Sequence, residues 1–260
     1  SILYGPGNNI HRTPYGGRKF EYYSEDGFLS GEMSEYEVAA IEEKGVGVVM
    51  KHFALNDSEQ DRIGLGVWLN EQAAREIYLK AFQAPVEKGN ANGVMIAYTR
   101  WGCTWSGGNK PLVTGILREE WGCDGLIITD NVLTTYVNGV DGVLSGVSTF
   151  DAMMPYVTKL LPKYEKDPVI VNAMREACHR NLYAIANSSG MNGIGKDTEI
   201  KDTGLLVVNV VRTLLIVFGA LFVLSLVMWI TRKRRFKKNY VYTPAAGTTK
   251  NAADEKASEA

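Results

Sequence analysis

Three short apolar segments of this 260-residue chain end in side chains that can do chemistry. They are residues 45–53, ending in Lys51 and His52; residues 93–99, ending in Tyr98; and residues 125–130, ending in Asp130. Each segment is short and rich in β-branched residues, which is typical of a buried parallel strand. Because the strands of a parallel barrel present their carboxyl ends on one face, we expect these side chains to meet there. A cation, an imidazole, a phenol and a carboxylate on one rim suit the binding of a polyol.

Each of these residues also has a simpler explanation when it is taken alone. An aspartate at a strand end is often the N-cap of the next helix, so Asp130 could be a cap. A single tyrosine such as Tyr98 is more often a packing residue than a catalytic one. The adjacent Lys51 and His52 are the hardest to dismiss, since lysine is rare at the end of a buried strand without a partner.

Segments with helical spacing alternate with these strands and must position them. We expect helices over residues 70–88, 110–120 and 167–186. The first begins at an asparagine and carries Ala73, Ile77, Ala81 and Ala84 on one side. Strand–helix alternation implies an α/β fold with a parallel sheet. No GxGxxG motif follows a strand, which favours a TIM-like (β/α)8 barrel over a dinucleotide-binding fold. A soluble body of residues 1–187 is shorter than a full barrel of roughly 250 residues, so we expect a partial barrel, incomplete at its N-terminus.

Composition excludes several other classes of protein. Residues 1–231 carry 20 basic and 26 acidic side chains, and this net negative body argues against a nucleic-acid partner. The three cysteines are widely spaced, with no CxxC motif and no disulfide framework. Three histidines argue against a multi-histidine metal site.

An uncharged apolar run near the C-terminus predicts a membrane anchor. Residues 213–230 would form a helix of roughly 27 Å, close to the hydrocarbon thickness of a bilayer. We expect a linker over 188–203, a single transmembrane helix over 204–231, and a basic stop-transfer segment with a disordered tail over 232–260. Six cations lie in 232–238, and they should stay on the cytoplasmic side, which leaves the body extracellular. A buried core helix is the alternative, but such helices rarely end in a block of cations.

Five motifs follow one another along residues 3–187 in a familiar order. They are YGPGNNIHRTPYGGRKFEYYSEDGFLSGEM, KHFALNDSEQDR, NEQAAREIYLKAF, GVMIAYTRWG and LREEWGCDGLIITD. In these motifs the chain resembles glycoside hydrolase family 3, the β-glucosidase-like enzymes. The resemblance implies a barrel domain that hydrolyses terminal, non-reducing β-D-glycosidic bonds with retention. A β-glucosidase is the first expectation and a β-xylosidase is possible.

The resemblance also implies roles for individual residues. Asp130 matches the catalytic nucleophile. The residues matched to sugar binding in the −1 subsite, or to positions beside it, are Arg18, Lys51, His52, Tyr98, Arg62 and Glu59. No cofactor and no metal is implied. Since a nucleophile must stay ionised, we expect Lys51 and Arg18 to hold the pKa of Asp130 down. A second carboxyl group, about 5–5.5 Å away, must protonate the leaving oxygen.

Two departures from the family pattern affect the expected activity. Asn131 follows the matched nucleophile where many members have tryptophan, which changes the expected leaving-group preference. The acid/base glutamate of the β-glucosidase branch usually comes from a second α/β domain, which these residues do not contain. We therefore expect a C-terminal piece of a protein with inverted domain order, whose upstream α/β domain supplies the acid/base, and an isolated chain with little or no activity.

Two non-enzymatic hypotheses remain beside the glycosidase. The chain could be a membrane-tethered glycan-binding module that keeps the sugar pocket without turnover. It could also be a membrane scaffold whose barrel is only structural, although the polar rim argues against that role.

Overall fold

The computed structural model describes residues 1–152, 157, 159, 161–198 and 203–240, in two compact units. The first unit is Ser1–Ile194 and the second is Gly195–Ala260. Each unit is described by itself. Part of the predicted linker, 199–202, and most of the predicted tail, 241–260, lie outside the described residues.

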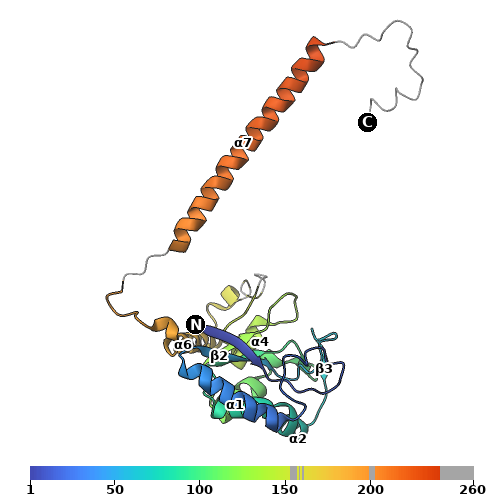
Figure 1. The fold of residues 1–260 in the computed structure, drawn as a ribbon, viewed down its shortest axis with the longest axis vertical. Coiled ribbons are helices and arrows are strands. Elements are labelled where there is room, and N and C mark those ends of the chain that lie inside the picture. Colours follow the sequence, from blue (N-terminus) through green and yellow to red (C-terminus); the bar gives the residue numbers. More distant parts are fainter. Residues whose placement is uncertain (153–156, 158, 160, 199–202, 241–260) are drawn as a thin grey trace, which may run out of the picture. The chain divides into compact units, whose positions relative to one another are not determined.

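A four-stranded parallel sheet forms the centre of the first unit (Figure 1). Its strands, in spatial and chain order, are β1 (Ile2–Gly7), β2 (Gly47–Phe53), β4 (Gly93–Ile96) and β7 (Leu126–Thr129). A single parallel bridge from Ile128 to Thr149 lies beyond β7. The three predicted strands are confirmed, and the predicted parallel α/β architecture with them. The first strand, β1, was not among the predicted elements.

Strands β2, β4 and β7 are buried on both faces, which explains their apolar runs, whereas Ile2, Leu3 and Tyr4 of β1 are exposed. Alternate residues such as Met50, Ile96 and Ile127 face a large core shared with the surrounding helices. The intervening residues Val49, Met95, Leu126 and Ile128 form a second cluster with Ala184 of α6 (Pro168–Ala186).

A smaller sheet lies in the connections that follow β2 and β4. It consists of β3 (Gly66–Val67), β5 (Arg100–Trp101) and β6 (Thr104–Trp105), and the 3-10 helix η2 (Ser106–Gly108) follows it directly. Strand β3 pairs in parallel with β5, and β5 pairs antiparallel with β6.

The helix α1 (Gly27–Glu43) joins β1 to β2 and packs against α3 (Lys80–Glu87). The Asp26 side chain caps it by accepting hydrogen bonds from the amides of Phe28 and Leu29. Its buried residues are mostly small: Gly27, Ser30, Gly31, Ser34 and Val38. A β-carbon at Gly27 would lie 2.2 Å from the carbonyl oxygen of Ile77, so this close helix contact requires glycine.

The helical segment predicted over 70–88 is present, but of the four residues predicted on one side only Ala81 is buried, while Ala73 and Ala84 are half-buried and Ile77 is exposed. It comprises α2 (Glu71–Ala73), the π-helical segment η1 (Ala74–Tyr78) and α3, and Asn70 caps it as expected. Ile77 is 43% exposed. The wider π turn places the next buried residue five positions after Ala74, at Leu79, so a 3.6-residue period gives the wrong face.

The other described helices of the first unit follow β4 and β7 in the chain, and α6 packs against β7. They are η3 (Pro111–Glu120), α4 (Gly139–Ser145), η4 (Leu161–Tyr164), α6 and η5 (Ser189–Met191). The predicted helices over 110–120 and 167–186 correspond to η3, which is π-helical, and to α6, which Asp167 caps.

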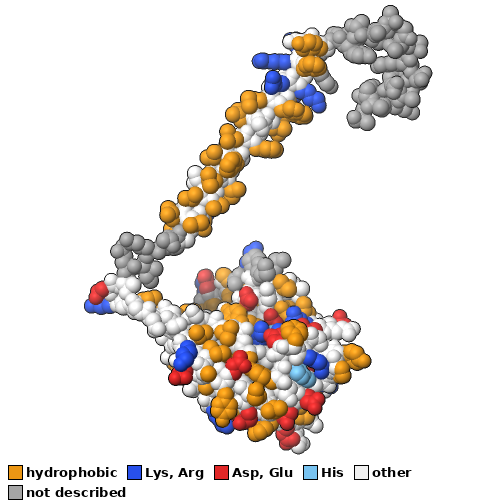
Figure 2. Space-filling view, in the orientation of Figure 1, with side chains coloured by type: hydrophobic (Ala, Val, Ile, Leu, Met, Phe, Trp, Pro, Cys, Tyr) orange, Lys and Arg blue, Asp and Glu red, His pale blue; other side chains and the backbone are white. Residues whose placement is uncertain are grey.

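One long helix, α7 (Thr203–Asn239), forms the described part of the second unit. Its segment Gly204–Phe236 is long and apolar enough to cross a membrane, with a mean hydropathy of 2.6 in its most apolar window. Apolar side chains lie along the whole segment, and Lys and Arg gather towards its C-terminal end (Figure 2).

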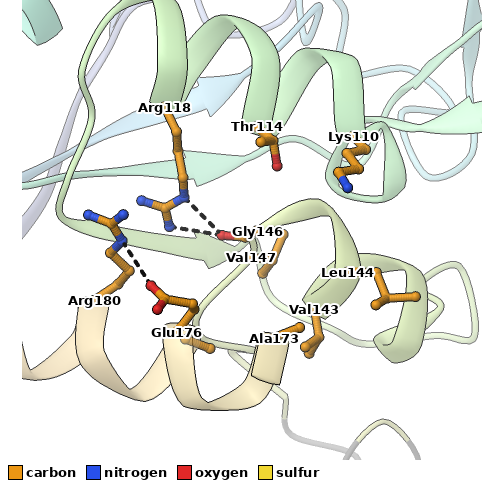
Figure 3. Close-up of a pocket in the computed structure, with 11 residues that line it drawn as sticks. Lys110, Thr114, Arg118, Val143, Leu144, Gly146, Val147, Ala173, Glu176 and Arg180 are labelled. Carbon is orange, nitrogen blue, oxygen red and sulfur yellow. Dashed lines mark hydrogen bonds and ion pairs between the residues drawn. The ribbon is translucent and has the colours of Figure 1, made fainter. Parts of the chain in front are cut away.

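Arg118 connects three separate segments of the first unit (Figure 3). From η3, its Nη1 donates to the carbonyl oxygens of Cys123 at 2.9 Å and Gly125 at 3.2 Å. Its Nε and Nη2 donate to the carbonyl oxygen of Gly146 at 3.3 and 2.8 Å. Arg118 lines a cavity of about 240 Å³ between η3, α4 and α6. Its Nε, Nη1 and Nη2 all donate to backbone carbonyl oxygens, so its role there is structural.

We expect Arg118→Met to lower the free energy of unfolding by about 2–4 kcal/mol, because partly buried carbonyls lose charge-assisted donors. Urea unfolding of the variant against the wild type measures the change. The exposed Arg175→Met is the matched control and should change stability by less than about 0.5 kcal/mol. Equal stability of the two variants would contradict this role of Arg118.

Candidate active site

The predicted polar side chains lie together at the carboxyl end of the parallel sheet. Lys51 and His52 lie near the end of β2, and Asp130 directly follows β7. Arg18 arrives on the loop between β1 and α1, and Arg62 on the loop between β2 and β3. The structure therefore brings residues that are more than 100 positions apart in the sequence to one rim.

A short electrostatic chain runs from Arg18 through His52 to Asp130. One Arg18 nitrogen, Nη1, lies 3.1 Å from Nε2 of His52, and that Nε2 lies 3.7 Å from Oδ2 of Asp130. Because a guanidinium can only donate, Nε2 of His52 must accept this hydrogen bond. The proton of the neutral ring is therefore assigned to Nδ1, which has no hydrogen-bond partner among the described residues.

His52 is uncharged at neutral pH because of its surroundings. Its side chain is 4% exposed, and burial lowers its pKa, with further lowering by the charges of Arg18, Lys51 and Arg62, to about 2. A neutral imidazole of fixed tautomer can offer its Nδ1–H to a hydroxyl oxygen.

The backbone around His52 is held by a residue that the sequence analysis did not single out. Asn9 follows β1, donates from Nδ2 to the His52 carbonyl at 3.0 Å, and accepts from the His52 amide at 2.8 Å. These paired bonds fix the end of β2 against the end of β1. Its place directly after an apolar segment, in GPGNN, was the available signal in the sequence.

Burial raises the pKa of Asp130, contrary to the expectation that Lys51 and Arg18 hold it down. The amide of Asn131, the Arg62 charge, the Tyr98 hydroxyl and Arg18 each lower it, but the removal of the carboxyl group from water outweighs them. Lys51 does not reverse this, since its ammonium is paired with Glu21 at 3.1 Å.

The two carboxyl oxygens of Asp130 have different surroundings. Its Oδ1 accepts the Asn131 amide at 2.7 Å, whereas Oδ2 has no hydrogen-bond partner among the described residues. The carboxyl group caps no helix, because the next one, α4, begins at Gly139 with Asn138 as its cap. Oδ2 is thus oriented by the backbone bond of Oδ1 and is left for a ligand.

Tyr98 supports the segment that carries Asp130. Its hydroxyl donates to the Asn131 carbonyl at 2.8 Å, and its ring packs edge-on against Tyr136 at 5.0 Å between ring centroids. The Arg62 guanidinium lies 4.7 Å from the Tyr98 ring centroid. Burial, followed by the charge of Asp130, raises the pKa of Tyr98 to about 12, so the phenol stays protonated.

Two glutamates hold the cations of the rim. Glu21, which was not predicted, bonds to both Lys51 and Arg18. Burial alone would raise the pKa of Glu21, but these hydrogen bonds outweigh it and lower the pKa. Glu59 pairs with Arg62 at 2.9 Å and with Arg18 at 3.6 Å, so the two residues of the predicted polar pair lie together. Glu21 lies three residues after Arg18 in GGRKFE, a spacing that could have indicated the first pair.

The arrangement can hold a small polyol against a carboxylate. Lys51, Arg18 and His52 lie on the same rim as Asp130, and their donors can bind hydroxyl groups of one sugar ring. The ion pairs with Glu21 and Glu59 fix two of these cations before a ligand arrives, which reduces the entropy lost on binding.

His52→Gln should flatten the pH dependence of stability. The unfolded chain takes up a proton at His52 near pH 6.5, whereas the folded chain does so only near about pH 2. Protonation below about pH 6.5 therefore favours the unfolded state, and His52 lowers the unfolding free energy by up to about 1.4 kcal/mol per pH unit. Urea titrations of both proteins from about pH 6.5 to about pH 4.5 measure the difference. Parallel curves would show that His52 is charged in the folded protein.

Comparison with known proteins places this geometry in a family. The family model described as glycosyl hydrolase family 3 N terminal domain matches residues 2–145. A beta-glucosidase of Ruminococcus albus is 45% identical over 128 residues, which are 49% of this chain and 14% of that protein. An exo-alpha-(1->6)-L-arabinopyranosidase of Bifidobacterium longum is 42% identical over 130 residues, which are 50% of this chain and 17% of that protein.

Solved structures agree with the sequence relatives. The beta-glucosidase 3B of Thermotoga neapolitana in complex with glycerol superposes with a TM-score of 0.68 at 31% identity, over 73% of this chain and 28% of that one. The beta-glucosidase of Bifidobacterium adolescentis gives 0.68 at 30% identity, over 77% of this chain and 29% of that one. This chain spans less than a third of each of these four proteins. With its parallel sheet in a TIM-barrel-like α/β fold and its match over residues 2–145, the chain belongs to glycosyl hydrolase family 3.

Proposed function

We propose that this chain supplies the nucleophile and the sugar-binding rim of a retaining glycosidase that hydrolyses terminal, non-reducing β-D-glycosidic bonds. A β-glucoside is the favoured substrate, because several relatives are named beta-glucosidases. Other relatives are named exo-alpha-(1->6)-L-arabinopyranosidases, so proteins similar to this chain also act on another sugar.

One observation carries the proposal: Oδ2 of Asp130 makes no hydrogen bond among the described residues and lies at the carboxyl end of the sheet, 3.7 Å from the His52 ring that Arg18 holds. Oδ2 would attack the anomeric carbon as the bond from that carbon to the leaving oxygen breaks. The bonding electrons pass to the leaving oxygen, which takes a proton from a general acid. Water then hydrolyses the glycosyl ester, with the same group acting as a base.

Burial serves this reaction in two ways. It strengthens the hydrogen bonds from Lys51, Arg18 and His52 to the sugar, because the local dielectric is low. It also raises the pKa of Asp130, so the acid limb of the activity profile should lie above the ordinary range of an aspartate.

The two glutamates of this rim, Glu21 and Glu59, are engaged by cations. The hydrogen bonds from Arg18 and Lys51 lower the pKa of Glu21, which makes it a poor proton donor. We therefore propose that an upstream α/β domain of the same gene product supplies the acid/base. Its carboxyl group should lie about 5–5.5 Å from Asp130.

We further propose that residues 204–231 cross a membrane once. The basic residues that follow would stay on the cytoplasmic side, so that the glycosidase body lies outside the cell. Its substrate would then be an extracellular oligosaccharide or β-glucoside.

A glycan-binding module without turnover is the second candidate. It is favoured by the pairing of both rim glutamates, Glu21 and Glu59, with cations. Calorimetric binding of glucose to the chain, with no hydrolysis even when the complete gene product is assayed, would support this alternative.

A fluorosugar label tests the proposed nucleophile without needing the missing acid. The fluoride of 2-deoxy-2-fluoro-β-D-glucosyl fluoride leaves without protonation, so Asp130 alone should form the glycosyl ester. We expect one sugar on the peptide that contains Asp130, detected by mass spectrometry after proteolysis. Asp130→Asn should abolish the label, a loss of at least about a hundredfold in rate.

Asp61→Asn is the matched control. Asp61 is exposed, lies on the same rim loop as Arg62, and has a φ of 52°, which asparagine also accepts. This variant should be labelled as fast as the wild type. A label on another side chain would overturn the role of Asp130, and a complete absence of label with normal glucose binding would favour the binding module.

A further inference from the structure

One face at the C-terminal end of α7 combines aromatic rings with cations. Residues at helical spacing line a shallow groove of about 520 Å³ there; they are Trp229, Arg232, Lys233, Arg235, Phe236, Asn239 and Tyr240. Figure 2 shows the Lys and Arg side chains gathered where the apolar part of the helix ends. A stop-transfer signal needs only positive charge, so the aromatic rings on this face call for a further explanation.

The aromatic and charged groups on this face are in contact with one another. Lys233 places its Nζ 4.9 Å from the Trp229 ring centroid, and the rings of Phe236 and Tyr240 stack at 4.6 Å. From Trp229 to Phe236 the helix rises roughly 10 Å, so in a membrane-spanning helix these rings and the cations between them would extend from the hydrocarbon boundary through the headgroup layer.

The charge balance of this segment selects an anionic occupant. Residues 232–238 contain six cations, and residues 203–253 contain no acidic side chain. No intramolecular carboxylate within this segment can neutralise them, in contrast to Lys51 and Arg18 in the body. Clusters of four to eight cations beside a transmembrane helix bind anionic lipids, at roughly a fivefold gain in affinity per cation.

We propose that the last turns of α7 form a binding site for the headgroups of anionic phospholipids in the surrounding leaflet. Arg232, Lys233 and Arg235 would hold the phosphate and the headgroup acid, with Trp229 against the glycerol region. The inference rests on the proposal that α7 spans a membrane and is independent of the glycosidase reaction. It ties the enzyme body to membranes, or membrane regions, of negative surface charge.

Lipid selectivity measured by electron spin resonance tests the site. The full chain is placed in phosphatidylcholine vesicles that contain spin-labelled phosphatidylserine or spin-labelled phosphatidylcholine, and resistance to alkaline extraction confirms insertion. We expect the serine lipid to associate roughly fivefold or more over the choline lipid, falling as salt is raised. The variant R232Q/K233Q/R235Q/K238Q should lose this preference.

A control of equal charge change separates a local site from net charge. It carries glutamine in place of the exposed Lys44, Lys88, Lys163 and Lys166 and should keep the wild-type preference. Equal association of both lipids with the wild type, or equal loss in both variants, would overturn the site. Failure to insert would overturn the spanning helix as well as the site, and the fluorosugar result would stand in either case. Equally tight binding of soluble glycerophosphoserine in neutral detergent would overturn the assignment to lipid.

Discussion

Parallel strand pairing is the constraint on which the candidate site depends. Strands β1, β2, β4 and β7 are all parallel, so their carboxyl ends lie at the same edge of the sheet. Register then sets the heights of the side chains: Lys51 pairs with Gly7, and Thr129, which precedes Asp130, pairs with Ile96. A slip of one residue in β2 would exchange Lys51 and His52 between the rim and the buried faces. The positions of the side chains at this rim are thus set by strand pairing, together with the two Asn9 hydrogen bonds to the His52 backbone.

Burial and neighbouring cations act in opposite directions on the pKa values of the carboxyl groups at the rim, and which of the two is stronger differs from one carboxyl group to the next. At Asp130 the desolvation of the carboxyl group outweighs its neighbours, whereas at Glu21 the bonds from Arg18 and Lys51 outweigh desolvation. At His52 burial and the neighbouring cations act together and keep the ring neutral. At the rim, therefore, the carboxyl group of Asp130 is available to react, that of Glu21 positions the cations Arg18 and Lys51, and the ring of His52 is uncharged.

The sequence analysis predicted the elements whose apolar residues form a continuous run. Strands β2, β4 and β7 are continuous apolar runs, and Asp130 was found because it ends such a run. Strand β1 was missed because Gly5, Pro6 and Gly7 interrupt its pattern. Helix α1 was missed because it buries glycine and serine rather than a stripe of large apolar residues. The raised pKa of Asp130 could not be predicted, since the depth of a carboxyl group depends on segments that are distant in the chain.

The central claim is that a sugar bound at this rim presents its anomeric carbon to Asp130. A crystal structure of the chain with bound glucose measures this directly. The account predicts the anomeric carbon about 3–3.5 Å from Oδ2, with ring hydroxyls on Lys51 and Arg18. Glucose bound at another surface, or at the rim with its anomeric carbon turned away from Asp130, would contradict it.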